Sequence, residues 1–457
     1  MKRSCVLVAL AAALASPAAA AADPEAVRAL VSDPGAAAAP GCAVGAFKAG
    51  KPLFITAAGM ADIAAGEPLD GDTRIYAASV SKQFTVLAAA TLITKGKLGL
   101  DDDIRTYLPE LPAYDAPVTV QMLIHHTSGV RDWLALARWS GSDDAAQFTK
   151  AKALDLLLRQ KQTNFTPGTD FTYSNGGYLL LAEIVERVSG MPFSDYAAKA
   201  VLKPLGMKSS VFMNGARPGS KIAHGYKPKD GGFEIRDTYP LISGSGGLMT
   251  TINDLARYEY DIEVGRKVWT PAVKAIMLEP GRLTNGEPAT RKPSRQAYAG
   301  GLMVGERRGQ HFVQHSGGAE AFRNQYIRLP DRRLGIAVFC NRSDWDPGEK
   351  ADAVLELIEG KILEPDVAPP GGRYYSDELR ATYEISTKGP ALTAAITSPY
   401  AVTGAPLTFT LSPDGVYRGD GMTLKFSDDR GSFTLGTDRV RGITFTRQAD
   451  TAASAAR

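Results

Sequence analysis

The sequence predicts an α+β fold followed by a small all-β domain. Apolar residues recur at three- and four-residue spacing from 80 to 262, which indicates helices. Short runs rich in β-branched and aromatic residues lie on both sides of this region, at 43–56 and 298–341, and indicate strands. We expect these strands to form one sheet covered by the helices. With 457 residues, the chain also exceeds the ~250–300 residues at which a single core stops growing.

The first residues have the pattern of a secretion signal. Lys2 and Arg3 precede an apolar run from Val6 to Leu14, and small residues follow from Ser16 to Ala22. Because a membrane span needs ~20 apolar residues, the sequence predicts a cleaved signal peptide over 1–22 rather than an anchor. We therefore expect a periplasmic or secreted protein without stable membrane insertion.

The region 23–363 carries the elements of the predicted main domain. A short helix over 24–32 and a hairpin with strands over 43–47 and 52–56 open it. Helices are expected over 80–94, 120–125, 148–158, 177–188, 193–201 and 252–262, strands over 298–304, 311–315, 322–328 and 334–341, and a closing helix over 349–363.

The rest of the chain is predicted to form a second domain. Residues 364–372 are rich in Pro and Gly, as in a stiff, exposed linker. From 373 to 448, alternating β-rich runs and frequent turn signals predict a small all-β barrel or sandwich. The polar, Ala-rich tail over 449–457 is expected to fray.

Composition excludes several classes of function. Lys and Arg total 52 against 49 acidic residues. A net charge of +3 lacks the large basic excess that is typical of nucleic-acid-binding proteins. Neither Cys-x-x-Cys nor His-Glu-x-x-His occurs, and the adjacent His125 and His126 cannot both face one site on a helix, so we expect no metal and no cofactor. Gly-x-Ser-x-Gly is also absent, which argues against an α/β-hydrolase.

A Ser-x-x-Lys motif, Ser79 to Lys82, begins a predicted helix. Positions i and i+3 share a helix face, so the Ser79 hydroxyl and the Lys82 amine are expected within reach of each other. A desolvated lysine can take the proton of a serine and make it a nucleophile. The alternative is an N-cap serine followed by a surface lysine.

Tyr173-Ser174-Asn175 precedes another predicted helix. A tyrosine pKa of ~10 falls beside a cation such as Lys82, and the Asn175 amide can donate to a substrate carbonyl while accepting from the lysine. The alternative is an ordinary turn before two glycines.

His315-Ser316-Gly317-Gly318 ends a late predicted strand. A backbone N–H beside glycines can approach a reacting carbonyl closely, so the N–H groups of Gly318 and Ser79 would form an oxyanion hole. The alternative is a strand-end histidine before a glycine turn.

In this order, the three motifs resemble the penicillin-binding-protein and class C β-lactamase family of serine hydrolases. Residues 123–130 and 246–256 are similar to two further stretches of that family, and the resemblance covers about 40–363. It implies a β-lactamase/transpeptidase-like antiparallel sheet with a helical subdomain. It also implies site roles, with Ser79 as the acylated nucleophile, Lys82 and Tyr173 as the base, and Asn175, His315 and Gly317 as substrate-binding residues.

One departure bears on the substrate. Many members have Lys-Thr-Gly where this chain has His315-Ser316-Gly317, and a neutral histidine anchors a carboxylate less well. The His-x-Gly form resembles the D-aminopeptidase, D-stereospecific carboxypeptidase and esterase branches, and 372–379 resembles the start of their lipocalin-like β domains. The implied substrate is a peptide or small molecule, including those with D-amino acids. An esterase, a weak β-lactamase and a penicillin- or peptidoglycan-binding sensor without turnover are alternatives, and the oligomeric state stays open.

The resemblance also bears on two cysteines. It places Cys42 and Cys340 on neighbouring antiparallel strands, where a disulfide could form in an oxidising compartment. Two buried free thiols are the alternative.

Overall fold

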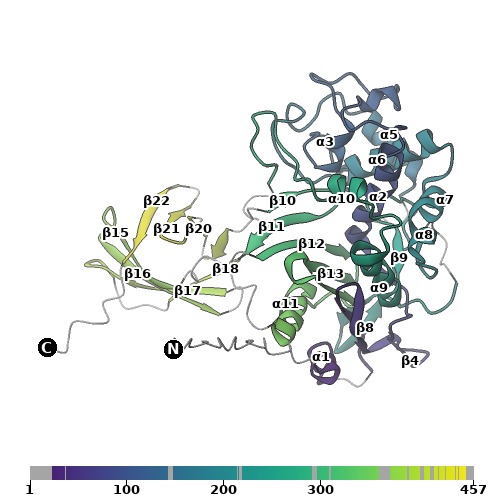
Figure 1. The fold of residues 1–457 in the computed structure, drawn as a ribbon. Coiled ribbons are helices and arrows are strands. Elements are labelled where there is room, and N and C mark those ends of the chain that lie inside the picture. The colour runs from purple at the N-terminus through teal and green to yellow at the C-terminus, as the bar shows by residue number, and fades with distance from the viewer. Residues whose placement is uncertain are drawn as a thin grey trace, which may run out of the picture.

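The computed structural model describes residues 23–448 with short gaps, at 36–37, 143–147, 214, 216–218, 291–295, 308–309, 360–370, 389–390, 402–405, 412–415, 420, 428, 438 and 441. The predicted signal peptide, the tail and most of the predicted linker lie outside the described residues. Within them, a main domain of sheet and helices is followed by a barrel of strands (Figure 1). None of the described helices is long and apolar enough to span a bilayer.

Seven antiparallel strands form the main sheet, in the order β10-β11-β12-β13-β14-β1-β2. Their bounds are β1 (Cys42–Lys48), β2 (Lys51–Ala58), β10 (Ala297–Tyr298), β11 (Met303–Arg307), β12 (Gln310–Ala319), β13 (Phe322–Leu329) and β14 (Leu334–Cys340). Val44 of β1 lies opposite Val338 of β14, so strands from the two ends of the domain are neighbours. The predicted α+β arrangement is confirmed.

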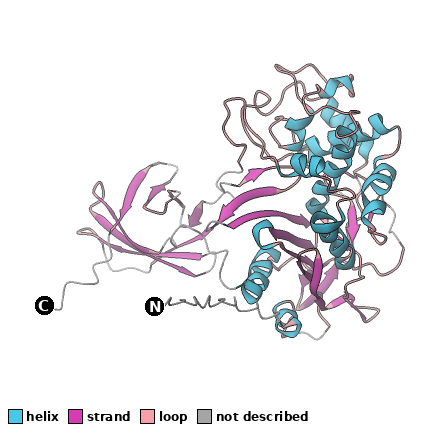
Figure 2. Cartoon of the chain, viewed as in Figure 1, coloured by secondary structure: helices cyan, strands magenta, loops and turns pink. Residues whose placement is uncertain are grey.

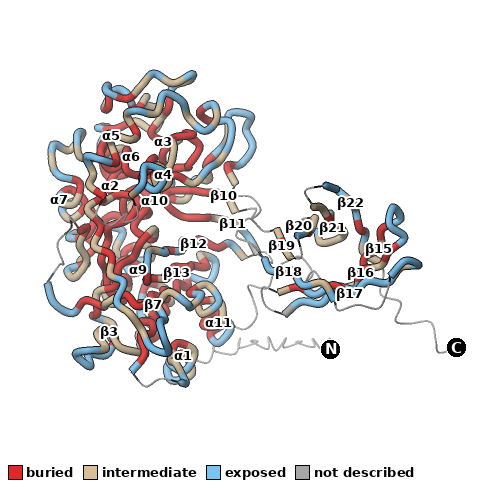
Figure 3. Tube along the Cα trace, turned by 180° about the vertical axis from the view of Figure 1, so that it is seen from behind, coloured by how far each residue is buried: buried red, intermediate tan, exposed pale blue. Residues whose placement is uncertain are grey.

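Helices cover both faces of this sheet (Figure 2). The larger group includes α2 (Ser81–Ile93), α6 (Asn175–Ser189), α9 (Ile252–Tyr260) and α10 (Pro271–Leu278), while α1 (Pro24–Leu30) and α11 (Pro347–Glu359) pack on the opposite face. Strand β14 is buried along its whole length because it is covered from both sides. Helix α2 is buried around nearly its entire circumference, as its apolar sequence requires (Figure 3).

Several short elements complete the main domain. Three strands of two or three residues, β5 (Ile75–Tyr76), β9 (Leu248–Thr250) and β6 (Val211–Phe212), form a small second sheet that the sequence pattern does not predict. The others are β3 (Met60–Asp62), β4 (Glu67–Pro68), η1 (Ala78–Val80), η2 (Ile104–Thr106), α3 (Val120–Ile124), α4 (Trp133–Trp139), α5 (Lys150–Leu158), α7 (Phe193–Ala197), η4 (Ala198–Leu202), α8 (Lys203–Leu205), β7 (Tyr226–Lys229), β8 (Gly232–Ile235), η5 (Asp261–Gly265) and η6 (Pro330–Arg332).

A disulfide joins the neighbouring strands β1 and β14 of the main sheet. Cys42 and Cys340 lie directly opposite each other in the ladder, with their Cα atoms 4.0 Å apart, and both are fully buried. The sequence left open whether these thiols are bonded or free, and the structure has them bonded.

The C-terminal domain is a closed barrel of eight consecutive antiparallel strands. They are β15 (Gly372–Ser376), β16 (Ala381–Lys388), β17 (Ala391–Thr397), β18 (Leu407–Leu411), β19 (Tyr417–Gly419), β20 (Met422–Phe426), β21 (Ser432–Gly436) and β22 (Ile443–Arg447). Inward-facing rings such as Tyr374, Phe409 and Phe433 are buried and fill the interior, and the ring centroids of Tyr374 and Phe433 lie 5.2 Å apart. The predicted barrel is confirmed, and its described residues form a packed core.

Candidate active site

Ser79 lies in a strained turn directly before α2. Strand β5 leads into the 3₁₀ turn η1, where Ala78 has a φ of +49°. This left-handed conformation costs an L-residue ~1 kcal/mol. Ser81 Oγ holds the turn, because it donates to the Ala78 carbonyl at 2.5 Å and accepts from the Leu248 N–H at 3.1 Å. Ser79 itself remains half-buried, and its hydroxyl faces the next residues of the site.

Lys82 is fully buried one turn after Ser79. Its Nζ contacts three acceptors, Ser79 Oγ at 3.2 Å, Asn175 Oδ1 at 2.9 Å and the Ser245 carbonyl at 2.6 Å. Burial lowers the pKa of the amine to about 7, against the opposing attraction of the Asp132 carboxylate. Near neutral pH, a large fraction of Lys82 is therefore uncharged and can accept the proton of Ser79.

Tyr173 and Asn175 approach Lys82 from the start of α6. The Tyr173 ring lies against the amine, with Nζ 4.7 Å from the ring centroid. Ser174 caps α6 by accepting from the Gly177 N–H at 3.0 Å, and this fixes Asn175 as the first helical residue. The structure thus brings together Ser79, Lys82, Tyr173 and Asn175, although the chain separates the two pairs widely.

Asp132 belongs to this site, and sequence analysis missed it. One carboxylate oxygen accepts from both the backbone N–H and the side-chain amide of Asn175, at 2.7 and 2.9 Å. The other oxygen caps α4 by accepting from the Ala135 N–H at 3.0 Å. An aspartate before an apolar run indicates a helix start, and that was the available signal for this residue. Its contact with Asn175 is tertiary and leaves no local pattern.

His315 lies on β12 beside Tyr173, with the two ring centroids 6.2 Å apart. The imidazole is buried, and both of its nitrogens contact protein groups. Nδ1 lies 2.6 Å from the Ser316 carbonyl, and Nε2 lies 2.9 Å from the Tyr298 hydroxyl. Because a carbonyl only accepts, Nδ1 carries a hydrogen. Both nitrogens are therefore already bonded within the protein, which disfavours direct binding of a substrate by His315.

Gly317 brings β12 against the turn that carries Ser79. A Cβ at this position would lie 2.3 Å from the Ala77 carbonyl oxygen and 3.3 Å from the Ser79 nitrogen. Strand β11 pairs with β12 only from Gln310 to Gln314, so the next residues of β12 extend beyond that partner. This open stretch includes Gly318. The role of the Gly318 N–H in an oxyanion hole stays a prediction.

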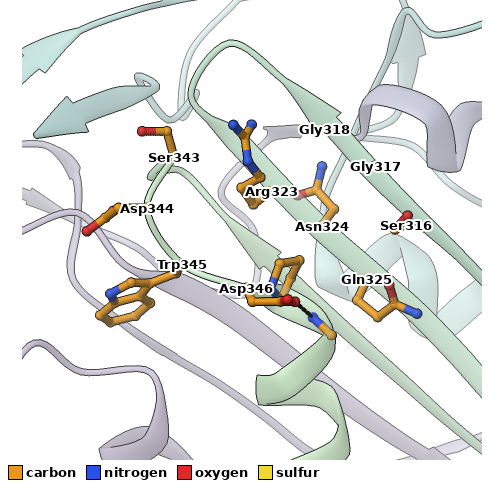
Figure 4. Close-up of a pocket in the computed structure, with 12 residues that line it drawn as sticks. Ser316, Gly317, Gly318, Arg323, Asn324, Gln325, Ser343, Asp344, Trp345 and Asp346 are labelled. Carbon is orange, nitrogen blue, oxygen red and sulfur yellow. Dashed lines mark hydrogen bonds between the residues drawn. The ribbon is translucent and has the colours of Figure 1, made fainter. Parts of the chain in front are cut away.

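A cavity of about 390 Å³ lies on the other face of this strand segment (Figure 4). Ser316, Gly317 and Gly318 line it, and Ser316 and Gly318 are exposed there, whereas His315 is buried beside Tyr173. The cavity is also lined by 323–325 of β13 and by 343–348 at the start of α11. The described residues contain no cluster of three or more His, Cys, Asp or Glu side chains placed to hold a metal ion.

The chain is similar to known proteins in both sequence and fold. A family model described as beta-lactamase matches residues 27–361. A D-aminopeptidase from Cereibacter sphaeroides is 28% identical over 402 residues, which cover 87% of this chain and 74% of that protein. The octameric penicillin-binding protein homologue from Pyrococcus abyssi aligns with a TM-score of 0.65 at 24% identity, over 89% of this chain and 96% of that one. The D-amino acid amidase from Ochrobactrum anthropi aligns with a TM-score of 0.61 at 22% identity, over 73% of this chain and 98% of that one.

Proposed function

This chain belongs to the beta-lactamase family, and from that premise we propose that it is an exported serine hydrolase that removes an N-terminal D-amino acid from peptides and amides. The family predicted from the sequence is confirmed by the family match. The similarity to a D-aminopeptidase over 87% of the chain supports the choice of substrate. The observation that carries the proposal is the carboxylate of Asp132 beside Asn175.

The proposed reaction begins with proton transfer from Ser79 to uncharged Lys82, 3.2 Å away. Ser79 Oγ then attacks the scissile carbonyl, and the N–H groups of Ser79 and Gly318 hold the oxyanion. Tyr173, whose ring lies against the Lys82 amine, passes the proton on to the leaving nitrogen. Water then attacks the acyl-enzyme while the same groups transfer protons in the reverse order, and Ser79 is released.

Asp132 supplies the negative charge that a substrate amine requires. It is half-buried, so a substrate can reach it, and its bonds to Asn175 place it next to the group that holds the substrate carbonyl. An α-ammonium adjacent to the scissile carbonyl would make a charge-assisted hydrogen bond there. A substrate without a free amine gains nothing from this carboxylate.

Efficient β-lactam hydrolysis is the weaker alternative. A β-lactam presents a carboxylate, which needs a hydrogen-bond donor or a cation to hold it. Both nitrogens of His315 on β12 are already in contact with protein groups. The nearby Asp132 carboxylate would repel a second negative charge. A sensor without turnover also fits poorly, because Lys82 has the buried, proton-accepting state that turnover needs.

Export is part of the proposal and rests on two observations. The sequence over 1–22 has the pattern of a cleaved signal. The buried Cys42–Cys340 disulfide is typical of proteins that fold in an oxidising compartment. Cell fractionation with an antibody against the barrel checks this, and recovery of unprocessed protein in the cytoplasm contradicts it.

The activity is tested on the mature chain from residue 23 with D-alanyl p-nitroanilide and its L enantiomer. We expect turnover of the D form, and loss of nearly all of it in Ser79→Ala, by analogy with the ~10⁶-fold losses of triad enzymes. A persistent fluorescent-penicillin adduct without turnover of either anilide supports the sensor instead.

Asp132→Asn separates amine recognition from general activity. The variant keeps an oxygen that accepts from Asn175 but loses the charge, and its NH2 group can no longer accept from the Ala135 N–H. We expect kcat/KM for D-alanyl p-nitroanilide to fall about 10- to 100-fold, as for loss of one charge-assisted bond, with a much smaller fall for p-nitrophenyl acetate, which has no amine. Equal losses on both substrates would mean that Asp132 only positions Asn175.

A further inference from the structure

Tyr173 lies in a segment that belongs to no helix or strand, so its position depends on contacts with the rest of the domain. Residues 171–174 lead into α6 and have no regular secondary structure. Thr172 is exposed, and Tyr173 itself is half-buried. A phenol on such a segment can move unless neighbouring groups hold it. The proposed reaction requires this phenol to stay against the Lys82 amine.

His126 binds the backbone on both sides of Tyr173. Its carbonyl accepts from the Thr172 N–H at 3.0 Å, and its Nδ1 accepts from the Ser174 N–H at 3.2 Å. Because Nδ1 is the acceptor in this bond, it carries no hydrogen. The residues before and after the phenol are therefore both held by one residue, which lies 48 positions before Ser174 in the chain.

The imidazole of His126 also packs against the phenol. The ring centroids of His126 and Tyr173 lie 4.3 Å apart, with the rings tilted by 42°. Two further rings, those of Tyr298 and Tyr178, have centroids 4.4 and 4.9 Å from that of the imidazole, and His126 is only 1% exposed. A side chain enclosed in a close-packed interior has little room to move. The imidazole therefore gives Tyr173 a fixed surface to rest on.

The backbone of His126 adopts a conformation that few residue types tolerate. Its φ is +59°, in the left-handed region, and it follows His125, the residue that ends α3. This conformation costs an L-residue ~1 kcal/mol and persists where the surrounding contacts hold it, often at functional sites. Here the turn directs both the carbonyl and the imidazole of His126 toward residues 172–174.

We propose that His126 is a positioning residue that acts through Tyr173: its carbonyl and Nδ1 hold the backbone on either side of the phenol, and its ring keeps the phenol against the Lys82 amine. The consequence for catalysis rests on the proposed function, in which Tyr173 passes a proton to the leaving nitrogen. The proposal also gives a task to the stretch 123–130, which the sequence analysis singled out by resemblance alone.

A double-mutant cycle with Tyr173→Phe tests whether His126 acts through the phenol. His126→Gly removes the ring and the Nδ1 acceptor, and glycine adopts a φ of +59° without strain. We expect kcat for D-alanyl p-nitroanilide to fall about 10- to 100-fold, the order for ångström-scale misplacement of a catalytic group. In the Tyr173→Phe background, the same substitution should change kcat by no more than about twofold, since no hydroxyl is left to position. Equal falls in the two backgrounds would overturn the proposal, because a merely structural role lowers both alike.

His126→Asn separates the hydrogen bond from the ring and covers misfolding of His126→Gly. Asparagine tolerates the left-handed backbone, and its side-chain oxygen can take the place of Nδ1 and accept from the Ser174 N–H. We expect a smaller fall in kcat than for His126→Gly, and again no further fall once Tyr173 is replaced by Phe. A fall that persists in the Tyr173→Phe background would overturn the proposal.

The matched control is Tyr196→Ala on α7. Tyr196 is also buried, and its hydroxyl lies 2.8 Å from the Thr91 hydroxyl of α2, so a buried ring and a hydrogen bond are lost there too. This substitution acts through packing alone. We therefore expect it to change kcat by the same factor in the wild type and in the Tyr173→Phe background, in contrast to the His126 variants.

Crystal structures of His126→Gly and His126→Asn give a readout that needs no turnover. We expect the Tyr173 ring to leave its place against Lys82 Nζ in His126→Gly and to move less in His126→Asn. A phenol in the wild-type position in both variants overturns the proposal. If the wild type does not hydrolyse the D-anilide, the proposed function fails, whereas the position of Tyr173 in the crystals still decides this proposal, so the two can fail separately.

Discussion

Lys82 is enclosed on every side, and this burial sets its protonation. A lysine in water stays charged at neutral pH, and a charged lysine cannot accept a proton. Three acceptors around Nζ satisfy the amine without restoring the solvation that burial removes. In the proposed mechanism, Lys82 can act as a base because α2 is buried inside the domain.

The pH dependence of activity follows from this burial. Because the folded-state pKa of Lys82 is lowered to about 7, the uncharged form is scarce below that pH and dominates above it. We expect kcat/KM to rise as the pH is raised through about 7, and to fall again above ~8, where the α-amine of the substrate loses the charge that Asp132 is proposed to bind. Steady-state rates on D-alanyl p-nitroanilide from pH 5 to 9 measure it, and a profile that falls across neutrality would contradict the assignment.

Gly317 shows how one missing side chain positions a strand. The Cβ of an alanine would lie 2.3 Å from the Ala77 carbonyl, which is backbone and cannot turn away. We expect Gly317→Ala to shift β12 from Ser79, to lower the free energy of unfolding by ~1–3 kcal/mol, and to reduce kcat at least ~10-fold, since ångström-scale misplacement is costly in catalysis.

Gly232→Ala is the control for Gly317→Ala. This exposed glycine of β8 has an ordinary φ, and the nearest atom to an added Cβ is 3.8 Å away. We expect the Gly232→Ala variant to have the free energy of unfolding and the kcat of the wild type. Equal effects of the two substitutions would show that the close approach at Gly317 is unimportant.

At the scale of elements, one predicted strand ends earlier than the strand observed, at the point where glycines begin. The predicted strand over 311–315 is the first half of β12, which continues to Ala319 through Gly317 and Gly318. Glycine has low strand propensity, so the pattern ends where the functional half begins. Likewise α4 has only seven residues and β5 only two, too short for any periodicity to be seen.

The disulfide between β1 and β14 closes a very long segment of chain. Cys42 and Cys340 are 298 residues apart, so the bond removes many conformations of the unfolded state. We expect the double variant Cys42→Ala/Cys340→Ala to lose ~2–5 kcal/mol of unfolding free energy. Urea unfolding of both forms measures the difference, and equal midpoints and slopes would show that strand pairing alone holds the sheet.

At the scale of the whole molecule, the sequence predicts the parts of the site better than their environment. Ser79, Lys82, Tyr173 and Asn175 were found because each belongs to a motif whose chemistry restricts the residue types. Asp132 and Tyr298 were not found, since each is a single residue whose partner lies elsewhere in the chain. Burial of Lys82 likewise arises only after the helices pack.

The ladder that joins β1 to β14, with β13 and β12 beyond, has a consequence for biogenesis. The ribosome makes Ser79 early and Gly317, which packs against its turn, late, with most of the main domain in between. A chain that ends before β12 therefore contains Ser79 and Lys82 but lacks the strand that packs against their turn. An arrangement that holds Gly317 against Ser79 can therefore form only after β12, β13 and β14 have been made and β14 has paired with β1.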